Sequence, residues 1–169
     1  MENIVRNYLE LKSLDDLIEK EKPNHKYIVE KVSTNDFQLN KFFYKQIGQN
    51  HNWNDRLVWD DKRWINYVSD SKVSTFVLKD DKDIAGFFEL IYHKNKFETE
   101  ISYFGLLEEF FGKKLGGYML SYAIKKSFSF KVKRVWVHTC SLDHENALKN
   151  YLSRGMRIYN TAILNLKSA

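Results

Sequence analysis

The chain has 169 residues, a formal net charge of +5 and a pI near 9.1. This length suits one domain with a sizeable core, and 43% hydrophobic with 29% charged residues is ordinary usage for a globular protein. One Pro and 7 Gly are too few for long disordered linkers, and the lone Cys140 excludes an internal disulfide or a zinc site built from cysteines. The aromatic share of 15% fits either a core or the wall of a ligand pocket.

The positive charge favours an anionic partner, either a nucleotide-like cofactor or a nucleic acid, although a lysine-rich solvated surface explains most of it equally well. A single cysteine indicates a reducing compartment. No apolar run approaches the roughly 18 residues that span a bilayer, and acidic and polar residues interrupt the N-terminus where a signal peptide would be apolar. The five histidines lack close ligand spacing. We therefore expect a cytoplasmic protein without a membrane contact or a metal.

The N-terminal half predicts strands and two helices. Residues 1–26 form a charged N-terminal extension with a strand at 8–11 and then a short helix, and 27–32 is a further strand. Polar residues from Ser33 to Asp36 can cap a helix that ends at Gly48. A polar and aromatic loop at 50–56 leads to a second helix over 60–68. Strands follow at 74–79, 84–92 and 97–104, and their short connections make them antiparallel neighbours.

The C-terminal half changes pattern. Apolar residues recur at helical spacing over 112–130, and 134–138 is a compact strand typical of a buried position. Asp143 can cap a helix over 144–154, which Gly155 ends, and two more strands are predicted at 156–159 and 162–166. This order of elements predicts a mixed α/β domain built around one sheet.

The start of the helix at 112–130 is rich in glycine. Gly112, Gly116 and Gly117 let an anion approach the unpaired N–H groups of the first turn, where the helix dipole is positive, and Lys113 and Lys114 add charge. A pyrophosphate would be held well there. The alternative is that the glycines only let the helix pack closely on the sheet. A P-loop is excluded because Lys114 stands where Ser or Thr is required and the earlier glycine is missing.

From about Thr75 onward the order of elements and two motifs resemble the GNAT acetyltransferase superfamily. Its helix signature, Gln/Arg-x-x-Gly-x-Gly/Ala, falls on residues 111–117. Gly116 supplies the second glycine and Gly117 follows it, whereas Phe111 and Lys114 depart from the signature.

The second motif lies on the last helix. The family often shows Asn-x-x-Ala-x-x-x-Tyr-x-x-x-Gly-Phe, and Ala147, Tyr151 and Gly155 match it in spacing. His144 stands at the Asn position and Met156 at the Phe position. The two motifs together cover roughly the C-terminal 60% of the chain.

This resemblance implies one GNAT domain over 1–169, with a central, mostly antiparallel sheet, a V-shaped splay between its fourth and fifth core strands, and helices on both faces. It implies acetyl-CoA as cosubstrate, bound in the splay. The pantetheine arm would pair with the backbone around Phe104, Leu106 and Leu107. The pyrophosphate side of the cofactor would be held by Gly112, Lys113, Lys114, Leu115, Gly116, Gly117 and His144.

Transfer to an amine requires the ammonium to lose its proton. Strand alternation puts Glu98, Glu100, Ser102 and Phe104 on one face, and the resemblance gives Glu100 the role of general base. A salt-bridged strand residue is the alternative for Glu100, and Glu98 and Glu89 are further candidates. The resemblance makes Tyr151 the general acid for the leaving thiolate, with simple helix packing as the alternative.

Trp53, Asp55 and Arg56 lie on a loop that in this family commonly walls the acceptor pocket, together with Glu89. A buried Asp55–Arg56 interaction that shapes the loop is an equal alternative, and Trp59 and Trp64 are expected to pack. His138 and Cys140 alternate near the cleft, but nothing in the sequence positions them as a Cys–His nucleophile. The acceptor is expected to be a small cationic or aromatic amine, with a protein amine left open.

Two other classes compete with an N-acetyltransferase. One is a catalytically silent module that binds acyl-CoA and regulates a partner, to which the departures at Phe111 and Lys114 leave room. The other is a basic nucleic-acid-binding domain, but its charges are explained by a solvated cluster at one helix end, namely Lys125, Lys126, Lys131, Lys133 and Arg134. We expect no nucleic acid, and the resemblance allows a homodimer.

Overall fold

The computed structural model describes residues 3–33 and 36–164. The strands are β1 (Ile4–Leu11), β2 (Tyr27–Lys31), β3 (Val73–Asp80), β4 (Asp83–His93), β5 (Glu98–Leu106), β6 (Arg134–Cys140) and β7 (Arg157–Leu164). The α-helices in these residues are α1 (Phe37–Gly48), α2 (Asp61–Ser69), α3 (Leu115–Phe128) and α4 (Ala147–Ser153). Three short 3-10 helices are η1 (Leu14–Asp16), η2 (Lys94–Lys96) and η3 (Glu108–Phe110).

The strands form one sheet in the order β2-β3-β4-β5-β6-β1-β7. Its neighbours pair antiparallel except for β5 and β6, which are parallel. Parallel strands need a long crossover, and α3 provides it. The predicted mixed α/β fold with a mostly antiparallel sheet is confirmed.

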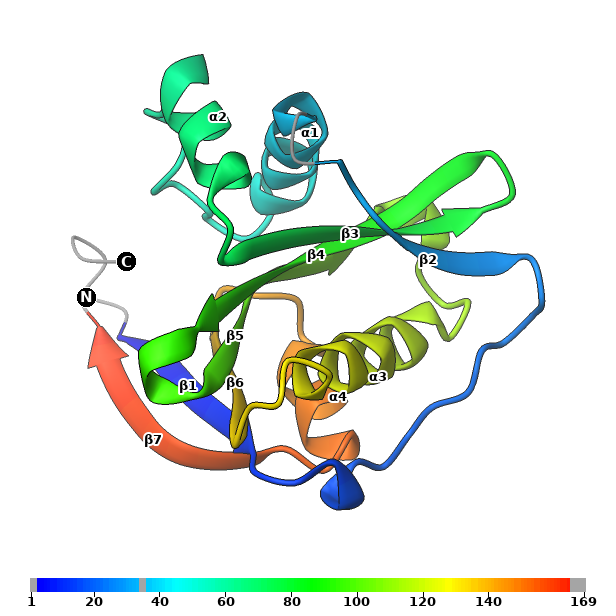
Figure 1. The fold of residues 1–169 in the computed structure, drawn as a ribbon, viewed down its shortest axis with the longest axis vertical. Helices are drawn as coiled ribbons and strands as arrows, with labels where there is room; N and C mark the ends of the chain where they lie inside the picture. Colours follow the sequence, from blue (N-terminus) through cyan, green and yellow to red (C-terminus); the bar gives the residue numbers. More distant parts are fainter. Residues whose placement is uncertain (1–2, 34–35, 165–169) are drawn as a thin grey trace.

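Helices cover both faces of the sheet. Figure 1 shows α1 and α2 over one face of β3 and β4, and α3 and α4 over the opposite face. On the first face, Phe43 of α1 stacks on Phe87 of β4 with ring centroids 4.9 Å apart. On the second, the predicted apolar rows of α3 are fully buried against the sheet, at Met119, Leu120, Ala123 and Ile124.

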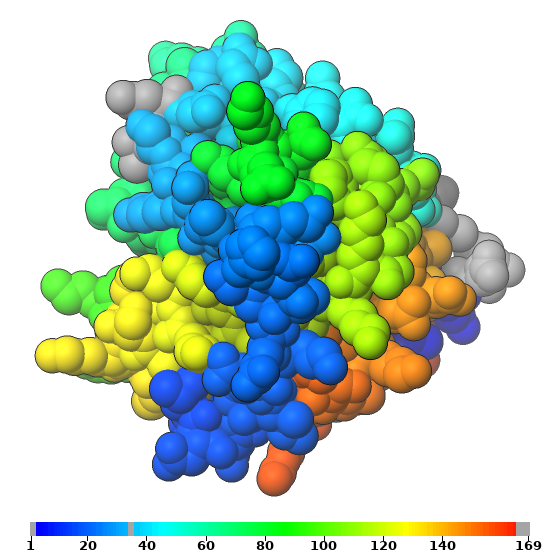
Figure 2. Space-filling view, turned by 90° about the vertical axis from the view of Figure 1, so that its right-hand side faces the viewer, coloured from blue at the N-terminus to red at the C-terminus, as the bar shows by residue number. Residues whose placement is uncertain are grey.

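The N-terminal residues are an integral part of the sheet. Strand β1 starts four residues earlier than predicted and lies between β6 and β7, where Tyr8 pairs with His138 on one side and Asn160 on the other. The segment after β1 then crosses α3 and α4. In Figure 2 it runs in blue between the yellow α3 and the orange region of α4. Lys20 N–H donates to Ser121 Oγ at 2.8 Å, and Ile18 N–H donates to the carbonyl of Arg154 at 3.0 Å.

Three predicted details of the C-terminal half are wrong. The helix predicted from residue 112 begins at Leu115, because Gly112 and Lys114 have positive φ values of 75° and 61°. The two predicted last strands are one strand, β7, and residues 165 and 166 of the second lie outside the described residues. Asp143 does not cap α4, since Asn146 is the N-cap residue.

The face assignment along β5 is also wrong beyond Glu100. Ile101 pairs with Leu90 and Tyr103 pairs with Glu89. The two partners are consecutive in β4, so β5 has one extra residue, Ser102, between its paired residues. Such a bulge reverses the alternation of side chains. Phe104 therefore faces α3 and α4, with the core, rather than sharing a face with Glu100.

Candidate active site

Strands β5 and β6 pair only near their first residues. The Cα pairs are Glu98↔Arg134, Thr99↔Val135 and Glu100↔Trp136, and the pairing stops there. Beyond these pairs lies a cavity of about 900 Å³, walled by the ends of both strands, the start of α3, α4 and the loop after α1. This volume is within the usual range for a small-molecule site. The predicted V-shaped splay is confirmed.

One end of the cavity is the start of α3. Lys114 is the N-cap residue in a left-handed conformation, and its side chain makes no capping hydrogen bond. The N–H groups of the first turn, which a helix cannot satisfy internally, lie at the cavity wall with Gly116 and Gly117. A Cβ built on Gly116 would meet Asn150 Nδ2 at 3.5 Å and nothing closer. The helix start therefore offers donors and open space to an anion.

Cationic side chains surround the same end. Lys114, Lys149 and Arg154 line the cavity, and Arg154 lies so close to Gly117 that a Cβ there would be 2.6 Å from its Nη1. Arg154 Nε is buried and has no hydrogen-bond partner among the described residues, and burial lowers the pKa of Arg154. Lys113, which was predicted here, instead lies 4.6 Å over the ring of Phe110 and does not line the cavity.

The end of β5 forms a second wall. Phe104 and Leu106 line the cavity, and β5 has no strand partner on that side after Glu100. Leu107 does not line it: its N–H donates to the Ala85 carbonyl at 2.9 Å, and its side chain borders a separate recess of about 200 Å³.

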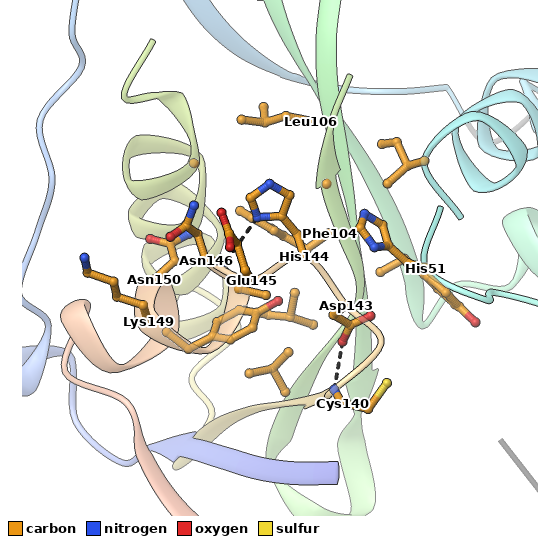
Figure 3. A pocket seen from close by; sticks show the side chains of 18 of the residues that line it. His51, Phe104, Leu106, Cys140, Asp143, His144, Glu145, Asn146, Lys149 and Asn150 are labelled. Carbon is orange, nitrogen blue, oxygen red and sulfur yellow. Dashed lines mark hydrogen bonds between the residues drawn. The ribbon is translucent and has the colours of Figure 1, made fainter. Parts of the chain in front are cut away.

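Helix α4 and the turn before it form the facing wall. Figure 3 shows His144, Asn146, Lys149 and Asn150 on this side of the cavity, with Leu106 across from them. His144 Nδ1 accepts the N–H of Asn146 at 3.1 Å, and its ring lies 5.0 Å from that of Phe111. His144 thus lines the cavity next to Phe111, one of the two residues that depart from the helix signature of the family.

Tyr151 brings a phenol to the centre of the site. It is 6% exposed, lines the cavity, and its ring lies 6.3 Å from that of Phe104. Burial, helped by the negative charge of Asp143, raises the pKa of Tyr151. The hydroxyl therefore stays protonated at neutral pH and can act as a donor.

The other end of the cavity is aromatic and acidic. Trp53, Asp55 and Tyr103 line it. The ring centroids of Trp53 and Tyr103 lie 4.6 Å apart, with an angle of 67° between the ring planes. Asp55 Oδ1 accepts hydrogen bonds from the hydroxyls of Tyr44 at 2.7 Å and Tyr103 at 2.8 Å. Burial is the main cause that raises the pKa of both tyrosines. The predicted Trp53 and Asp55 thus meet here, together with Tyr103, which sequence reasoning missed because the bulge at Ser102 turns it to this face.

Arg56 and Glu89 were predicted at the acceptor pocket, but the structure does not bring them to the cavity. Neither lines the cavity, and their side chains are 4% and 0% exposed. Arg56 Nη1 lies 2.9 Å from Glu89 Oε2, and Asn40 and Tyr67 also donate to that carboxylate. Arg56 pairs with Glu89 rather than with its neighbour Asp55. The ion pair instead anchors the loop that carries Trp53.

The predicted base Glu100 also lies outside the cavity lining. Its Oε2 is 3.1 Å from His93 Nε2, so it is the paired strand residue that was the alternative. Glu98 is buried and bound to Arg134 at 2.9 Å. The carboxylates of β5 therefore have partners on the sheet face and do not reach the cavity.

Asp143 lines the cavity, although the sequence predicted it only as the cap of a helix. Its Oδ2 accepts from Thr139 Oγ1 at 2.7 Å and from the Cys140 N–H at 2.8 Å, and Figure 3 shows the latter bond. Its Oδ1 lies 3.5 Å from Trp53 Nε1. Burial, with Asp143 nearby, raises the pKa of Cys140, which keeps the thiol protonated and argues against a nucleophilic thiolate.

The structure is thus an α/β domain with a split sheet, a helix start without a side-chain cap at one end of the split, and Tyr151 on the wall of the cavity. The family model "Acetyltransferase (GNAT) family" matches residues 34–156. This match covers well over half of the 169 residues, so the chain belongs to the GNAT acetyltransferase family, a family of acyltransferases.

Solved structures share the fold. A GCN5-related N-acetyltransferase from Sphaerobacter thermophilus aligns with a TM-score of 0.72 at 12% identity, over 100% of this chain and 56% of that one. Another, from Kribbella flavida, gives 0.66 at 14% identity over 95% and 58%. An aminoglycoside acetyltransferase from an uncultured soil metagenomic sample, in complex with trehalose, gives 0.64 at 12% identity over 79% and 90%. This chain therefore spans little more than half of the first two proteins.

These low identities show the fold alone. No curated protein sequence matches the chain. Of the helices in residues 3–33 and 36–164, none is long and apolar enough to cross a membrane. Across the same residues, His, Cys, Asp and Glu side chains form no group of three that could hold a metal ion.

Proposed function

We propose that this chain transfers an acetyl group from acetyl-CoA to the nitrogen of a small amine. One observation carries the proposal: the start of α3, which has no side-chain cap, and the Arg154 side chain line one end of the same cavity that Tyr151 lines. The first N–H groups of α3 have no acceptor within the helix, so an anion at this end of the cavity would supply one.

The residues present fit a CoA-like group. The N–H groups at Gly116 and Gly117, with Lys114 and Arg154, would receive the pyrophosphate, since helix dipole and guanidinium both favour anions there. The unpaired edge of β5 at Phe104 and Leu106 would pair with the amide groups of the pantetheine arm, as a further strand would.

The thioester of the bound cosubstrate supplies the acetyl group. Tyr151, kept protonated by burial, would give its proton to the leaving sulfur. The close walls of the cavity would hold amine and thioester together, which removes much of the entropic cost of the encounter.

The acceptor end selects the amine. Trp53 and Tyr103 offer ring faces, which attract a cation, and the Asp55 and Asp143 carboxylates lie beside them. This combination favours a small cationic amine, with an aromatic ring or a second ammonium group as the part that contacts the rings.

The test is an assay of thiol release from acetyl-CoA with a panel of tyramine, tryptamine, 1,4-diaminobutane and N-acetyl-lysine amide. The wild type is expected to release thiol with at least one amine, and Tyr151→Phe to lower kcat by about tenfold or more while KM for acetyl-CoA stays the same. Phe42→Leu, at an exposed site of α1, is the matched control and should keep full activity. Binding of acetyl-CoA without turnover of any amine would refute the transferase and leave the silent binding module.

A further inference from the structure

His138 occupies the point where the sheet splits. The last β5–β6 pair is Glu100↔Trp136, and His138 is the next residue of β6 on the same face as Trp136. Its Cα pairs with Tyr8 of β1, and its ring lies 5.7 Å from the Tyr8 ring. Both His138 and Ser102, which faces the split from β5, line the cavity. The imidazole therefore lies at the apex of the split, inside the cavity.

The other histidines near the site are occupied. His93 is bound to Glu100 outside the cavity, His51 Nδ1 lies 3.3 Å from the Leu142 carbonyl, and His144 Nδ1 accepts the Asn146 N–H. Neither ring nitrogen of His138 has a hydrogen-bond partner among the residues that the structure describes. His138 is thus a cavity-lining histidine whose ring nitrogens no described residue engages.

Charged and titratable groups on each neighbouring element lie close enough to His138 to influence its ring. Strand β1 contributes Arg6 and Tyr8, β5 contributes Glu100, the turn after β6 contributes Asp143, and the loop after α1 contributes Asp55. Burial and Arg6 lower the pKa of His138, while the three carboxylates oppose them, and the net direction is downward. The ring is therefore neutral and able to accept a proton at neutral pH.

Several carboxylates near the cavity already have hydrogen-bond or ion-pair partners, Asp143 among them through Thr139 and the Cys140 N–H, whereas Glu145 is an exposed residue of the turn before α4. Glu89 is bound to Arg56, Glu100 is bound to His93, and Asp55 accepts hydrogen bonds from two tyrosines. The oxygens of these carboxylates are therefore already engaged by protein donors. The His138 imidazole lines the cavity and has no such partner among the described residues, so it is the group left to accept a proton there.

We propose that His138 is the general base of the acetyl transfer, an inference that rests on the proposed function. The His138 imidazole takes one proton from the acceptor ammonium. The nitrogen lone pair then forms a bond to the thioester carbonyl carbon, and the C–S bond breaks with its electrons on sulfur. The sulfur takes the proton of the Tyr151 hydroxyl. The attacking amine nitrogen then loses a second proton, which restores the Tyr151 hydroxyl. The His138 imidazolium returns its proton to solvent. Glu100 acts only through its negative charge near the ring.

The experiment compares wild type with His138→Gln, and with His25→Gln, a variant at an exposed histidine in the segment before β2. The specificity constant kcat/KM is measured from pH 5 to 9, with whichever of the four amines named above the wild type acetylates best. Wild type and His25→Gln should lose activity on the acidic side as the base protonates. His138→Gln should be about 10²–10⁴-fold slower near neutral pH and lack that acidic limb. Calorimetry should give it an unchanged Kd for acetyl-CoA.

Added imidazole gives a second readout. It should raise the rate of His138→Ala in proportion to its unprotonated fraction and leave the wild type unchanged. Wild-type turnover together with a full rate and an unaltered pH profile in His138→Gln would overturn the assignment of His138 while the transferase stands. Wild type that acetylates none of the amines would refute the proposed function itself, and the base with it.

Discussion

The guanidinium of Arg56 and the carboxylate of Glu89 form an ion pair 2.9 Å apart beneath the acceptor end of the cavity, where their side chains are 4% and 0% exposed. Five aromatic rings surround the guanidinium, and their centroids lie 4.1–5.8 Å from Arg56 Cζ. They belong to Tyr44, Trp59, Trp64, Tyr67 and Tyr103. The pair joins the loop after α1 to β4. The position of Trp53 and Asp55 at the cavity thus depends on a buried charge pair that does not line it.

Glu89→Gln is expected to lower the free energy of unfolding by about 3–5 kcal/mol, because it leaves the Arg56 charge buried without its counter-charge. Urea denaturation followed by circular dichroism measures this loss. Glu30→Gln is the matched control, because its own side chain is exposed, its partner Lys79 is partly exposed, and solvated pairs contribute less than about 1 kcal/mol. Equal losses in the two variants would show that burial adds nothing to the pair.

Gly155 ties the end of α4 to the N-terminal segment. Its φ of +92° is unfavourable for other residues, and a Cβ at this position would collide with the carbonyl oxygen of Asp16. Gly155→Ala should destabilise the protein by about 2 kcal/mol or more. Gly116→Ala, in a helix with no atom closer than 3.5 Å to the new Cβ, should be neutral or stabilise it by up to about 1 kcal/mol. A thermal melt in which Gly155→Ala matches the wild type would contradict the close contact.

Arg154→Met tests the anion-binding end of the cavity. Loss of a charge-assisted hydrogen bond should raise the Kd for acetyl-CoA about tenfold to a hundredfold, and the difference from wild type should shrink as salt is added. Lys113→Met, at the lysine that lies over Phe110 outside the cavity, should bind like the wild type. Calorimetric titration at two salt concentrations gives both values. A larger effect at Lys113 than at Arg154 would reverse the assignment.

The pH dependence of stability should report on His138. Burial and Arg6 lower its pKa below the usual value of about 6.5, so the unfolded chain binds this proton more readily than the folded one. The resulting stability is fully present above about pH 6.5, the unfolded value, and is lost as the pH falls from there through the lower pKa of the folded state. His138→Gln should flatten this decline in urea titrations between pH 7.5 and 5, whereas His25→Gln should keep it. An unchanged slope in His138→Gln would mean that the imidazole is not buried as described.

Local patterns sufficed for most of the elements. Capping residues, apolar periodicity and glycine stops placed α1 and α2 close to their observed bounds and found α3 and α4 with starts three residues too early, and the two motifs placed Gly116 and Tyr151 at one cavity. The position of β1 between β6 and β7 could not be read in this way, because its partners are more than 120 residues away in the chain.

The side-chain partners at the site also escaped the sequence. Strict alternation along β5 gave Glu100 the face of Phe104, and the single extra residue at Ser102 reverses that assignment. Asp143 has the sequence position of a helix cap, but its carboxylate binds Thr139 and the Cys140 N–H instead. The partner of Arg56 is on a strand 33 residues away rather than at Asp55. Each of these depends on contacts between distant segments, which periodicity does not encode.

The most direct measurement is a calorimetric titration of acetyl-CoA into wild type, Gly116→Ala and Gly116→Trp. A Cβ at Gly116 points between Asn150 and Leu106, two residues that line the cavity, so alanine fits and an indole fills the space that the pyrophosphate needs. Binding with a Kd on the order of micromolar in wild type and Gly116→Ala, weakened at least about a hundredfold in Gly116→Trp, is the predicted result. No binding by the wild type, or equal binding by Gly116→Trp, would contradict the assignment of this cavity to acetyl-CoA.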